Sequence, residues 1–375
     1  MSQLEIAPSF PPEVLAELPT PCLIVDLAAA ERNIERAAAY FSASPVNLRP
    51  HFKAHKCTAL MRRQIAAGGC SGVTCATAWE AEVLAEAGFV DILVANQVVD
   101  QSGLRSLARA APAGLTVCVD DPAHVAILEE TACEADVQFA VLIEVDVGMV
   151  RCGLSAGSDT LISLARLIET SSHLQFDGIQ GYEGHAVLKD TREERTTLVA
   201  KGAAMLRHER ERLEDAGIDC RIVSGGGTGT FDISTDAGAL DEIQAGSYVL
   251  MDARYGGLDL PFENALYCCT TVISRQRDGA VVNSGLKALS AEYGMSRSVD
   301  PSIEVVKLSD EHAQLRLSED HPLHVGDNVL LVPAHIDPTV NLYGSLIVFS
   351  EEGLVDEWSV DGRRQWPAGV GGAAR

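Results

Sequence analysis

The chain has 375 residues and a formal net charge of −24, from 53 acidic and 29 basic side chains. This length predicts two compact units, and the acidic balance argues against nucleic acid or a membrane surface as a partner, because both are themselves anionic. Hydrophobic residues make up 47% and charged residues 22%, which is typical of a globular protein with a sizeable core and excludes a disordered or fibrous chain.

The opening segment and the cysteines bear on the compartment. The segment MSQLEIAPSFPPEVLAELPTP has acidic residues and prolines but no apolar run with basic flanks, so we expect no secretory signal. No stretch approaches the roughly 20 apolar residues that a membrane helix needs. The ten cysteines lack CxxC pairs or a regular spacing, as expected for buried thiols in a reducing environment. The sequence therefore predicts a cytoplasmic protein.

Strand-like and helix-like segments alternate along the first two thirds of the chain. After the helical pattern AAAERNIERAAAYF, eight strands can be counted, at NLRPHFK, GVTCAT, DILVAN, LTVCVD, FAVLIEVDV, FDGIQGYEGH, CRIVSGGG and EIQAGSYVL. Repeated strand–helix units predict an α/β fold with a parallel sheet. The count of eight favours a (β/α)8 TIM barrel over a doubly wound sheet. We place this barrel at residues 25–254.

The helix after the second strand has a defined start. Thr77-Ala-Trp-Glu80 matches a capping box, and Val83, Leu84 and Ala87 follow on one side of the expected helix. This pattern supports the strand-then-helix interpretation locally.

Beyond Arg254 the helical pattern stops. Strand-like runs joined by turns follow, at ALYCCTTVISR, AVVNSG, IEVVKLS, HAQLRL, NVLLVPAHID and SLIVFS. They predict an all-β unit of residues 255–375, which we expect residues 1–24 to join through the strand-like segment TPCLIVDL. The tail PAGVGGAAR is expected to fray.

Active sites of such barrels lie at the C-terminal ends of the strands. The polar residues at those ends therefore form one candidate set, which consists of Lys53, His55, Thr77, Asn96, Asp120, Asp146, Arg151, Tyr182, Glu183, His185, the loop 224–230 and the segment 246–248.

A glycine-rich loop, SGGGTGT, follows the seventh strand. Its backbone N–H groups, with the hydroxyls of Ser224 and Thr228, can bind an anionic phosphate. The segment AGSY follows the eighth strand, and barrels commonly hold phosphate at these two strands. A flexible turn is the simpler interpretation of any single glycine-rich loop. Two such loops favour a phosphate-bearing ligand.

The first strand, RPHFKAHKC, ends near Lys53. A lysine there faces a phosphate site at the seventh and eighth strands, an arrangement that can hold pyridoxal phosphate as a Schiff base. Taken alone, Lys53 is more simply a surface lysine. Strand alternation puts Arg49 and His51 on the same face, so we expect both to support Lys53, whereas Lys56 falls on the other face or in the loop.

The motifs RPHFKAHK, EVDVGMVRCG, GYEGH, SGGGTGT and AGSYVLMD together resemble the fold type III pyridoxal-phosphate enzymes, the group of alanine racemase, D-serine dehydratase and D-threonine aldolase. The resemblance covers nearly the whole chain. Its most specific parts are the lysine of the first motif and the Asp-x-Gly-x-x-Arg-x-Gly run from Asp146 to Gly153. It implies an alanine racemase-like barrel and a homodimer.

The resemblance also implies roles for single residues. Lys53 would be the Schiff-base lysine, Arg151 would lie near the phenolic oxygen of the cofactor, and Tyr182 would approach its pyridine ring. Thr77 occupies a position where some relatives carry a different polar residue. The expected cofactor-binding residues are Lys53, Thr77, Arg151, Tyr182, Ser224, Gly226, Gly227, Thr228, Gly229, Gly246, Ser247 and Tyr248.

The all-β unit carries a possible metal site. In VPAHIDPTVNLY, His335 and Asp337 are two residues apart, so on a strand both would project to one side and could bind one divalent cation. Without context, a polar pair at a strand end is the simpler interpretation. The pair resembles the His-x-Asp metal site of D-threonine and 3-hydroxy-D-aspartate aldolases, whereas D-serine dehydratases have His-x-Cys with zinc. The oxygen ligand favours Mn²⁺ or Mg²⁺.

These expectations together predict a carbon–carbon lyase of the D-threonine aldolase type, which cleaves a small β-hydroxy-D-amino acid by retro-aldol chemistry, as from D-threonine to glycine and acetaldehyde. The metal would lower the pKa of the β-hydroxyl, and His185 is the expected base. The aldolases carry a histidine slightly farther along, where this chain has Leu188, which leaves the base or the substrate open.

Three alternatives remain. A dehydratase of D-serine or 3-hydroxy-D-aspartate would use the metal to polarise the leaving hydroxyl, but Asp337 in place of cysteine argues against it. An amino-acid racemase needs a second acid/base and no metal. A non-catalytic pyridoxal-phosphate carrier would require neither the all-β unit nor the His335–Asp337 pair.

Overall fold

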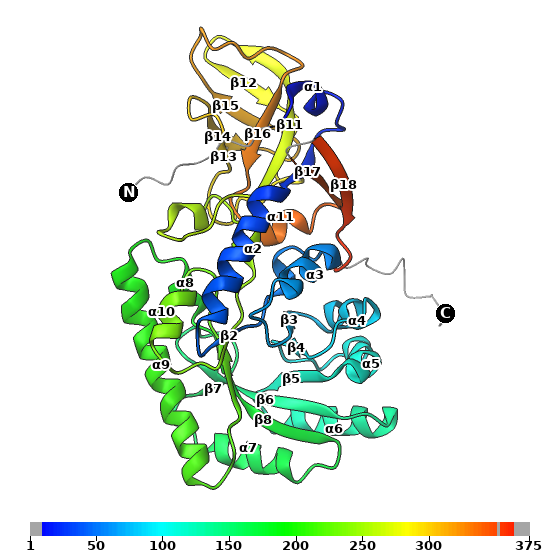
Figure 1. The fold of residues 1–375 in the computed structure, drawn as a ribbon, viewed down its shortest axis with the longest axis vertical. Coiled ribbons are helices and arrows are strands. Elements are labelled where there is room, and N and C mark those ends of the chain that lie inside the picture. Colours follow the sequence, from blue (N-terminus) through cyan, green and yellow to red (C-terminus); the bar gives the residue numbers. More distant parts are fainter. Residues whose placement is uncertain (1–9, 351–352, 364–375) are drawn as a thin grey trace.

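The computed structural model describes residues 10–350 and 353–363. Its lower part in Figure 1 is a barrel of parallel strands in the order β2-β10-β9-β8-β6-β5-β4-β3. Parallel bridges from Leu48 to Cys70 and from His51 to Thr74 join the two ends of this sheet. The eight predicted strands and the (β/α)8 barrel are thus confirmed. The strands are β2 (Asn47–Leu48), β3 (Val73–Cys75), β4 (Ile92–Val94), β5 (Leu115–Val119), β6 (Phe139–Asp146), β8 (Leu174–Gly181), β9 (Ile222–Gly225) and β10 (Glu242–Ile243), and the short β7 (Leu154–Ser155) pairs with the end of β6.

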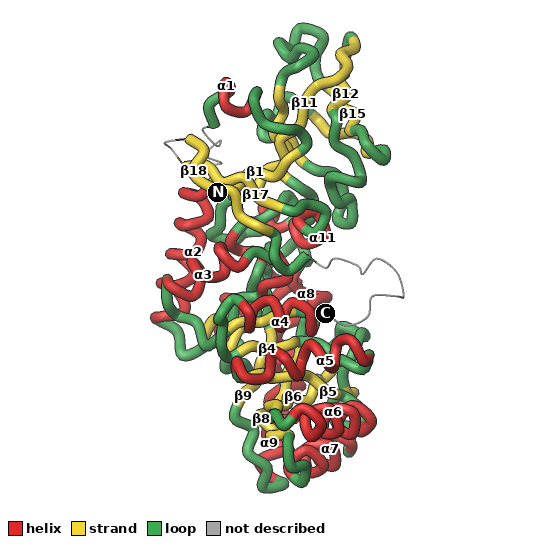
Figure 2. The backbone as a smooth tube through the Cα atoms, turned by 90° about the vertical axis from the view of Figure 1, so that its right-hand side faces the viewer, coloured by secondary structure: helices red, strands yellow, loops and turns green. Residues whose placement is uncertain are grey.

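Helices cover the outside of the barrel, as the stack of α4 to α7 in Figure 2 shows. The Thr77 side chain caps α4 by accepting from the Glu80 N–H at 3.2 Å, while the Glu80 carboxylate accepts from the Ala76 N–H at 2.8 Å. Among the described residues, every helix is too short or too polar to span a bilayer. The main helices are α2 (Leu27–Ser42), α3 (Thr58–Ala66), α4 (Ala78–Glu86), α5 (Gln101–Ala110), α6 (Pro122–Ala135), α7 (Thr160–Glu169), α9 (Arg192–Asp215) and α10 (Phe231–Asp236).

Shorter helical turns occupy the connections. They are α1 (Pro12–Leu15), η1 (Phe52–Ala54), η2 (Ala111–Ala113), α8 (Gly184–Val187), η3 (Ser247–Val249), η4 (Tyr255–Gly257) and α11 (Ile336–Val340).

The upper part of Figure 1 is a second, mostly antiparallel sheet in the order β14-β15-β12-β11-β1-β17-β18, in which β16 also pairs with β11 and β13 pairs with β16. The opening strand β1 (Cys22–Asp26) lies between β11 and β17, antiparallel to the first and parallel to the second. The sequence analysis did not predict β13 and β18. The other strands are β11 (Leu266–Gln276), β12 (Gly279–Val282), β13 (Arg297–Ser298), β14 (Glu304–Leu308), β15 (Ala313–Arg316), β16 (Asn328–Val332), β17 (Ser345–Ser350) and β18 (Gly353–Ser359).

The barrel and this β domain share one buried apolar cluster, to which Ile143 of the barrel and Val348 of the β domain both belong. After β18, the Asp361 carboxylate accepts from the Thr58 N–H at 2.9 Å, and the Gly362 N–H donates to the Lys56 carbonyl at 2.9 Å. The end of the described chain therefore packs against the loop that follows Lys53. The first nine residues of the opening segment and the tail PAGVGGAAR lie outside the described residues.

Candidate active site

The lysine segment leaves the barrel as extended chain and then turns. Beyond β2, the N–H of His51 still donates to the Ala245 carbonyl at 3.0 Å. The turn η1 begins directly afterwards, and the His51 imidazole accepts from the Lys53 N–H at 3.4 Å. The expected strand alternation therefore ends before Lys53, and the turn sets the direction of its side chain.

Lys53 forms an ion pair with Asp337 of the β domain. Burial favours the neutral form of Asp337, but Lys53 and His335 outweigh it, so the pKa of this carboxyl is held well below its usual range. Burial likewise disfavours the Lys53 ammonium, but Asp337 outweighs it and raises the pKa of the amine. Both groups are therefore charged at neutral pH, and the pair joins the barrel to the β domain.

The predicted metal pair lies at the start of a short helix. His335 is the extended residue before α11, and Asp337 belongs to its first turn. The expectation that both residues project from a strand was therefore wrong. The turn nevertheless brings His335 Nε2 to 3.6 Å from Asp337 Oδ1. Within the described chain, no group of three or more His, Cys, Asp or Glu side chains surrounds a common point.

The two oxygens of Asp337 differ in their surroundings. Oδ2 pairs with Lys53, whereas Oδ1 is buried and makes no hydrogen bond within the described residues. A buried carboxylate oxygen without a donor is costly, and this one lies beside an imidazole nitrogen. This nitrogen and oxygen therefore fit a divalent cation, which would satisfy Oδ1.

His335 is held from its other side. Its Nδ1 lies 2.8 Å from a carboxylate oxygen of Glu292, and the Tyr293 ring lies 4.5 Å from the imidazole between ring centres. Burial lowers the pKa of His335, but Asp337 and Glu292 outweigh it and the net pKa is raised. A carboxylate on Nδ1 leaves Nε2 directed at Asp337, as is usual for a metal-binding histidine.

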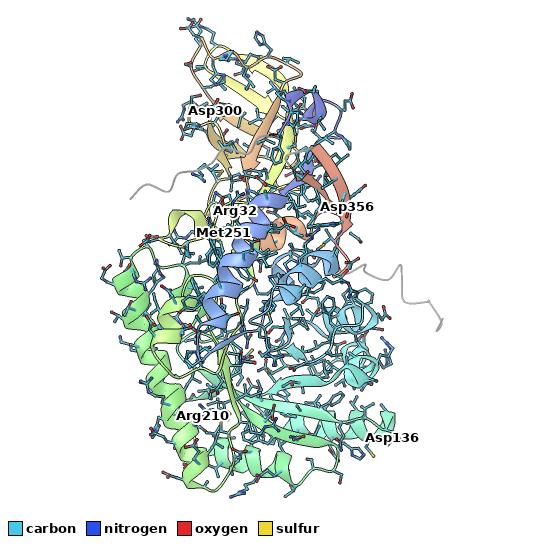
Figure 3. All side chains as sticks on the ribbon, in the orientation of Figure 1. Arg32, Asp136, Arg210, Met251, Asp300 and Asp356 are labelled. Carbon is cyan, nitrogen blue, oxygen red and sulfur yellow. The ribbon has the colours of Figure 1, made fainter. Side chains whose placement is uncertain are left out.

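Asp252 ties this helix start to the barrel and was missed by the sequence analysis. Its two oxygens accept from the N–H groups of Tyr255 at 2.8 Å and Ile336 at 3.1 Å. Burial raises its pKa to about 6. The preceding Met251 has a positive φ of 54° and lies where the barrel meets the β domain (Figure 3). Asp252 ends the motif AGSYVLMD, but the motif does not reveal its role, because its partners come from two separate turns.

The glycine loop after β9 offers unused donors. Gly226 has φ +75°, and a Cβ on Gly229 would lie 1.8 Å from the Val187 carbonyl oxygen, so only glycine fits there. Within the described chain, the N–H groups of Gly227, Thr228 and Gly229 make no hydrogen bond. Adjacent free N–H groups of this kind form an anion-binding cradle.

Glu183 braces this loop from behind. Its buried carboxylate accepts from the Gly226 N–H at 3.2 Å and from the hydroxyls of Thr230 at 3.0 Å and Ser234 at 2.6 Å. The sequence analysis placed Glu183 among the strand-end polar residues without a role. Its position in GYEGH indicates proximity to the site, but its three partners lie more than forty residues away.

We expect Glu183→Ala to weaken pyridoxal phosphate binding at least about tenfold, because each buried donor left without an acceptor costs about 1–3 kcal/mol. Titration of the cofactor by absorbance measures the affinity. Ser234→Ala removes one of the three contacts and should have a smaller effect. An unchanged affinity in Glu183→Ala would show that the brace does not shape the loop.

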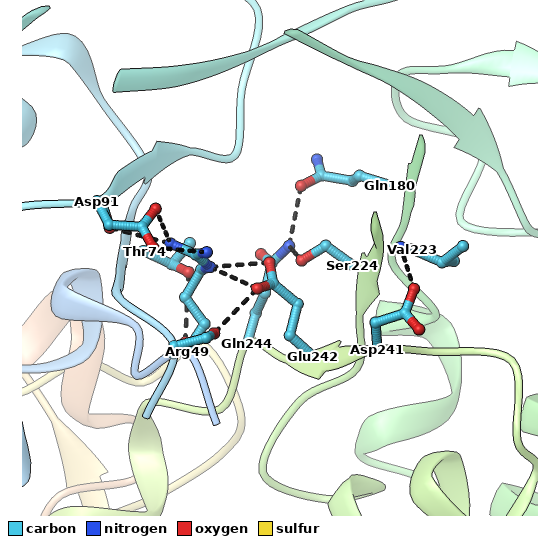
Figure 4. Close-up of polar contacts among 10 residues, drawn as sticks. Arg49, Thr74, Asp91, Gln180, Val223, Ser224, Asp241, Glu242 and Gln244 are labelled. Carbon is cyan, nitrogen blue, oxygen red and sulfur yellow. Dashed lines mark hydrogen bonds and ion pairs between the residues drawn. The ribbon is translucent and has the colours of Figure 1, made fainter. Parts of the chain in front are cut away.

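Three expected cofactor-binding side chains have other partners. The Ser224 hydroxyl accepts from Gln244 at 2.7 Å inside the barrel (Figure 4). The Tyr248 phenol accepts from Gln64 at 2.9 Å, while its backbone N–H donates to the Thr228 hydroxyl at 3.1 Å. Thr77 caps α4. The segment 246–248 remains beside the lysine strand, since a Cβ on Gly246 would lie 2.5 Å from the His51 carbonyl oxygen.

Arg151 and Tyr182 lie together. The Arg151 guanidinium is 5.6 Å from the centre of the Tyr182 ring and 3.9 Å from the buried carboxylate of Glu144. Burial raises the pKa of the Tyr182 phenol, and the Lys53 ammonium partly opposes this. Tyr182 also approaches the glycine loop, since a Cβ on Gly227 would lie 3.5 Å from its ring. The structure thus brings Lys53, Tyr182, Arg151 and the loop together.

His185 lies on α8 and packs against the loop after β6, where a Cβ on Gly148 would lie 3.0 Å from the imidazole. Its Nδ1 is buried and has no hydrogen-bond partner in the described residues. Within the same residues, no hydrogen bond or ion pair links it to Lys53, His335 or Asp337.

Arg49 was expected to support Lys53, but its partners are acidic residues of the neighbouring barrel segments. The buried guanidinium pairs with Glu242 at 2.8 Å and with Asp91 at 3.0 Å (Figure 4). The Ser71 hydroxyl also donates to Glu242, at 3.0 Å. This network connects the first barrel strand to its neighbours.

Comparisons with known proteins agree with this architecture. A family model described as the N-terminal domain of alanine racemase matches residues 25–254, and one described as a putative serine dehydratase domain matches residues 265–349. The solved structure of D-threonine aldolase from Filomicrobium marinum has a TM-score of 0.90 and 36% identity, and the match covers 93% of this chain and 96% of that one.

Curated relatives match along nearly their whole length. D-threonine aldolase from Arthrobacter sp is 35% identical over 95% of this chain and 96% of the relative. 3-Hydroxy-D-aspartate aldolase from Paracoccus denitrificans (strain Pd 1222) is 34% identical over 95% of both chains. D-threo-3-hydroxyaspartate dehydratase from Delftia sp. (strain HT23) is 28% identical over 92% of this chain and 98% of the relative. The chain therefore belongs to the alanine racemase-type barrel family that includes D-threonine aldolase and 3-hydroxy-D-aspartate aldolase.

Proposed function

We propose that this protein is a pyridoxal-phosphate- and divalent-metal-dependent lyase that cleaves β-hydroxy-D-amino acids, as from D-threonine to glycine and acetaldehyde. The observation that carries the proposal is a contact between the two domains. Lys53 of the barrel pairs with Asp337 of the β domain, and Asp337 lies beside His335. An amine for an aldehyde cofactor and a cation site thus lie side by side. The aldolase names of the relatives support the same reaction.

The site residues fit pyridoxal phosphate. The free N–H groups of the glycine loop suit its phosphate, and Lys53 offers the amine for its aldehyde. When bound, this cofactor takes up the electrons released as the Cα–Cβ bond breaks. Arg151 and Tyr182 would hold its ring side, and Glu183 keeps the loop in place.

The His335–Asp337 pair fits a divalent cation, because Asp337 Oδ1 makes no hydrogen bond within the described residues and lies 3.6 Å from His335 Nε2. A cation there lowers the pKa of a hydroxyl bound to it. The carboxylate ligand favours manganese or magnesium, and Glu292 would hold His335 in the ligating orientation. We keep His185 as the proposed base for the β-hydroxyl proton, since its Nδ1 is without a partner among the described residues.

We also propose that the protein is a homodimer. In each subunit, the cofactor site would lie in a barrel of residues 25–254, and the metal pair in a domain of residues 1–24 and 255–375. A cytoplasmic location is supported by the ten cysteines, none of which forms a disulfide, as is usual in a reducing compartment.

The decisive test is product identification with D-threonine and D-serine, with and without EDTA. We expect glycine and acetaldehyde from D-threonine, loss of this activity on chelation, and its recovery with manganese. Release of 2-oxobutanoate or pyruvate with ammonia would replace the aldolase with a dehydratase. Asp337→Ala should keep the absorbance of the bound cofactor and lose the dependence on metal.

A further inference from the structure

A divalent cation at the His335–Asp337 pair would have to share the Asp337 carboxylate with the Lys53 ammonium. Asp337 gives Oδ2 to the Lys53 ammonium and presents Oδ1 to His335 Nε2, 3.6 Å away. A divalent cation between His335 and Oδ1 would therefore lie on the same carboxylate as an ammonium ion. The Asp337 side chain is 15% exposed and that of Lys53 is 41% exposed, so water screens the repulsion between the two cations only in part.

We propose that the Lys53 ammonium opposes cation binding at the His335–Asp337 pair, so that attachment of Lys53 to the cofactor strengthens metal binding. This inference rests on the proposed function and adds a coupling between the binding of the cofactor and the binding of the metal. The ammonium opposes the metal in two ways. Lys53 Nζ pairs with one oxygen of the carboxylate that would bind the metal, and its positive charge repels a second cation.

Attachment would take this ammonium away from Asp337. The Lys53 nitrogen would form a C=N bond with the aldehyde carbon of the cofactor, and the aldehyde oxygen would leave as water with two of the three ammonium protons. The third proton would stay on the imine nitrogen or pass to solvent, and no oxidant or reductant is required. Nζ would then be bonded to the cofactor and would no longer be the free ammonium that pairs with Asp337. Because binding free energies are reciprocal, a bound cation should in turn favour attachment of the cofactor.

Cofactor-free protein tests the proposal through manganese affinity, measured by electron paramagnetic resonance without substrate. Lys53→Met removes the charge at nearly constant length, and Lys53→Arg keeps it. We expect Lys53→Met to bind manganese at least about tenfold more tightly than wild type, and Lys53→Arg to bind as weakly as wild type. Circular dichroism checks that each variant is folded. Wild-type protein should gain affinity once it is loaded with pyridoxal phosphate.

Equal affinity in wild type and both variants would overturn the inference, as would weaker binding by Lys53→Met. Equal affinity before and after cofactor loading would also overturn it. These outcomes leave the proposed function standing, since manganese would still bind. His335→Ala separates the two failures: if this variant binds manganese as wild type does, the metal site is elsewhere, and both the inference and the metal part of the proposed function fail.

Discussion

Lys53→Ala should have no visible absorbance from bound pyridoxal phosphate and no turnover of D-threonine above background. The amine of Lys53 contacts Asp337 of the His335–Asp337 pair. Its removal takes away the amine that we propose forms the Schiff base with the cofactor. Absorbance spectra of purified protein and an acetaldehyde assay measure both effects.

The matched control is Lys56→Ala, three residues farther along the chain. Lys56 lies in the loop after η1 with φ +53°, and its ammonium pairs with the buried carboxylate of Glu80 at 3.1 Å. The absorbance band should therefore persist in this variant. A band that survives in Lys53→Ala and disappears in Lys56→Ala would reverse the assignment of the two lysines.

Arg49→Met should cost the fold about 3–5 kcal/mol, because it leaves the buried carboxylate of Glu242 without its cationic partner. Arg49 has only 5% of its side chain exposed, and Glu242 has 4%. Ser71 still donates one hydrogen bond to Glu242 but brings no charge. Urea unfolding monitored by circular dichroism measures the loss of stability.

Arg277→Met is the control for a broken ion pair without burial. Arg277 pairs with Glu319 at 3.1 Å, but their side chains are 83% and 61% exposed, so the expected change is at most about 1 kcal/mol. If Arg49→Met unfolds like wild type but loses cofactor absorbance, Arg49 supports Lys53 after all and the network is not structural.

The barrel could be predicted because strand and helix patterns alternate regularly along its sequence. Eight runs with β-branched residues and helical patterns between them leave few arrangements other than a closed parallel sheet. The lysine and the glycine loop could also be predicted, because strand order alone brings the C-terminal ends of the first, seventh and eighth strands to one end of the barrel. Short edge elements such as β13 were missed, because two residues carry no periodic signal.

Local geometry at the site could not be predicted in the same way. The sequence around Lys53 alternates like a strand, yet the chain turns at η1. Likewise, a strand was expected at His335, but the structure has the start of α11 there. The choice between a strand and a turn depends on tertiary contacts, here those of Asp252 with the backbone of Ile336. Glu183 and Asp252 lie in the motifs GYEGH and AGSYVLMD, but these motifs do not reveal their roles, because the partners of Glu183 and the Ile336 partner of Asp252 are distant in sequence.

The position of β1 has a consequence for biosynthesis. This strand is made among the first residues, yet its two neighbours are β11 (Leu266–Gln276) and β17 (Ser345–Ser350). On the ribosome, the barrel sequence is complete long before β1 can find β17, and unpaired strand edges are prone to aggregation. The turn with His335 and Asp337 is also made late. A nascent chain can therefore complete its cofactor-binding barrel first, and the metal-binding half of the site is assembled only after the strands of the β domain have been made.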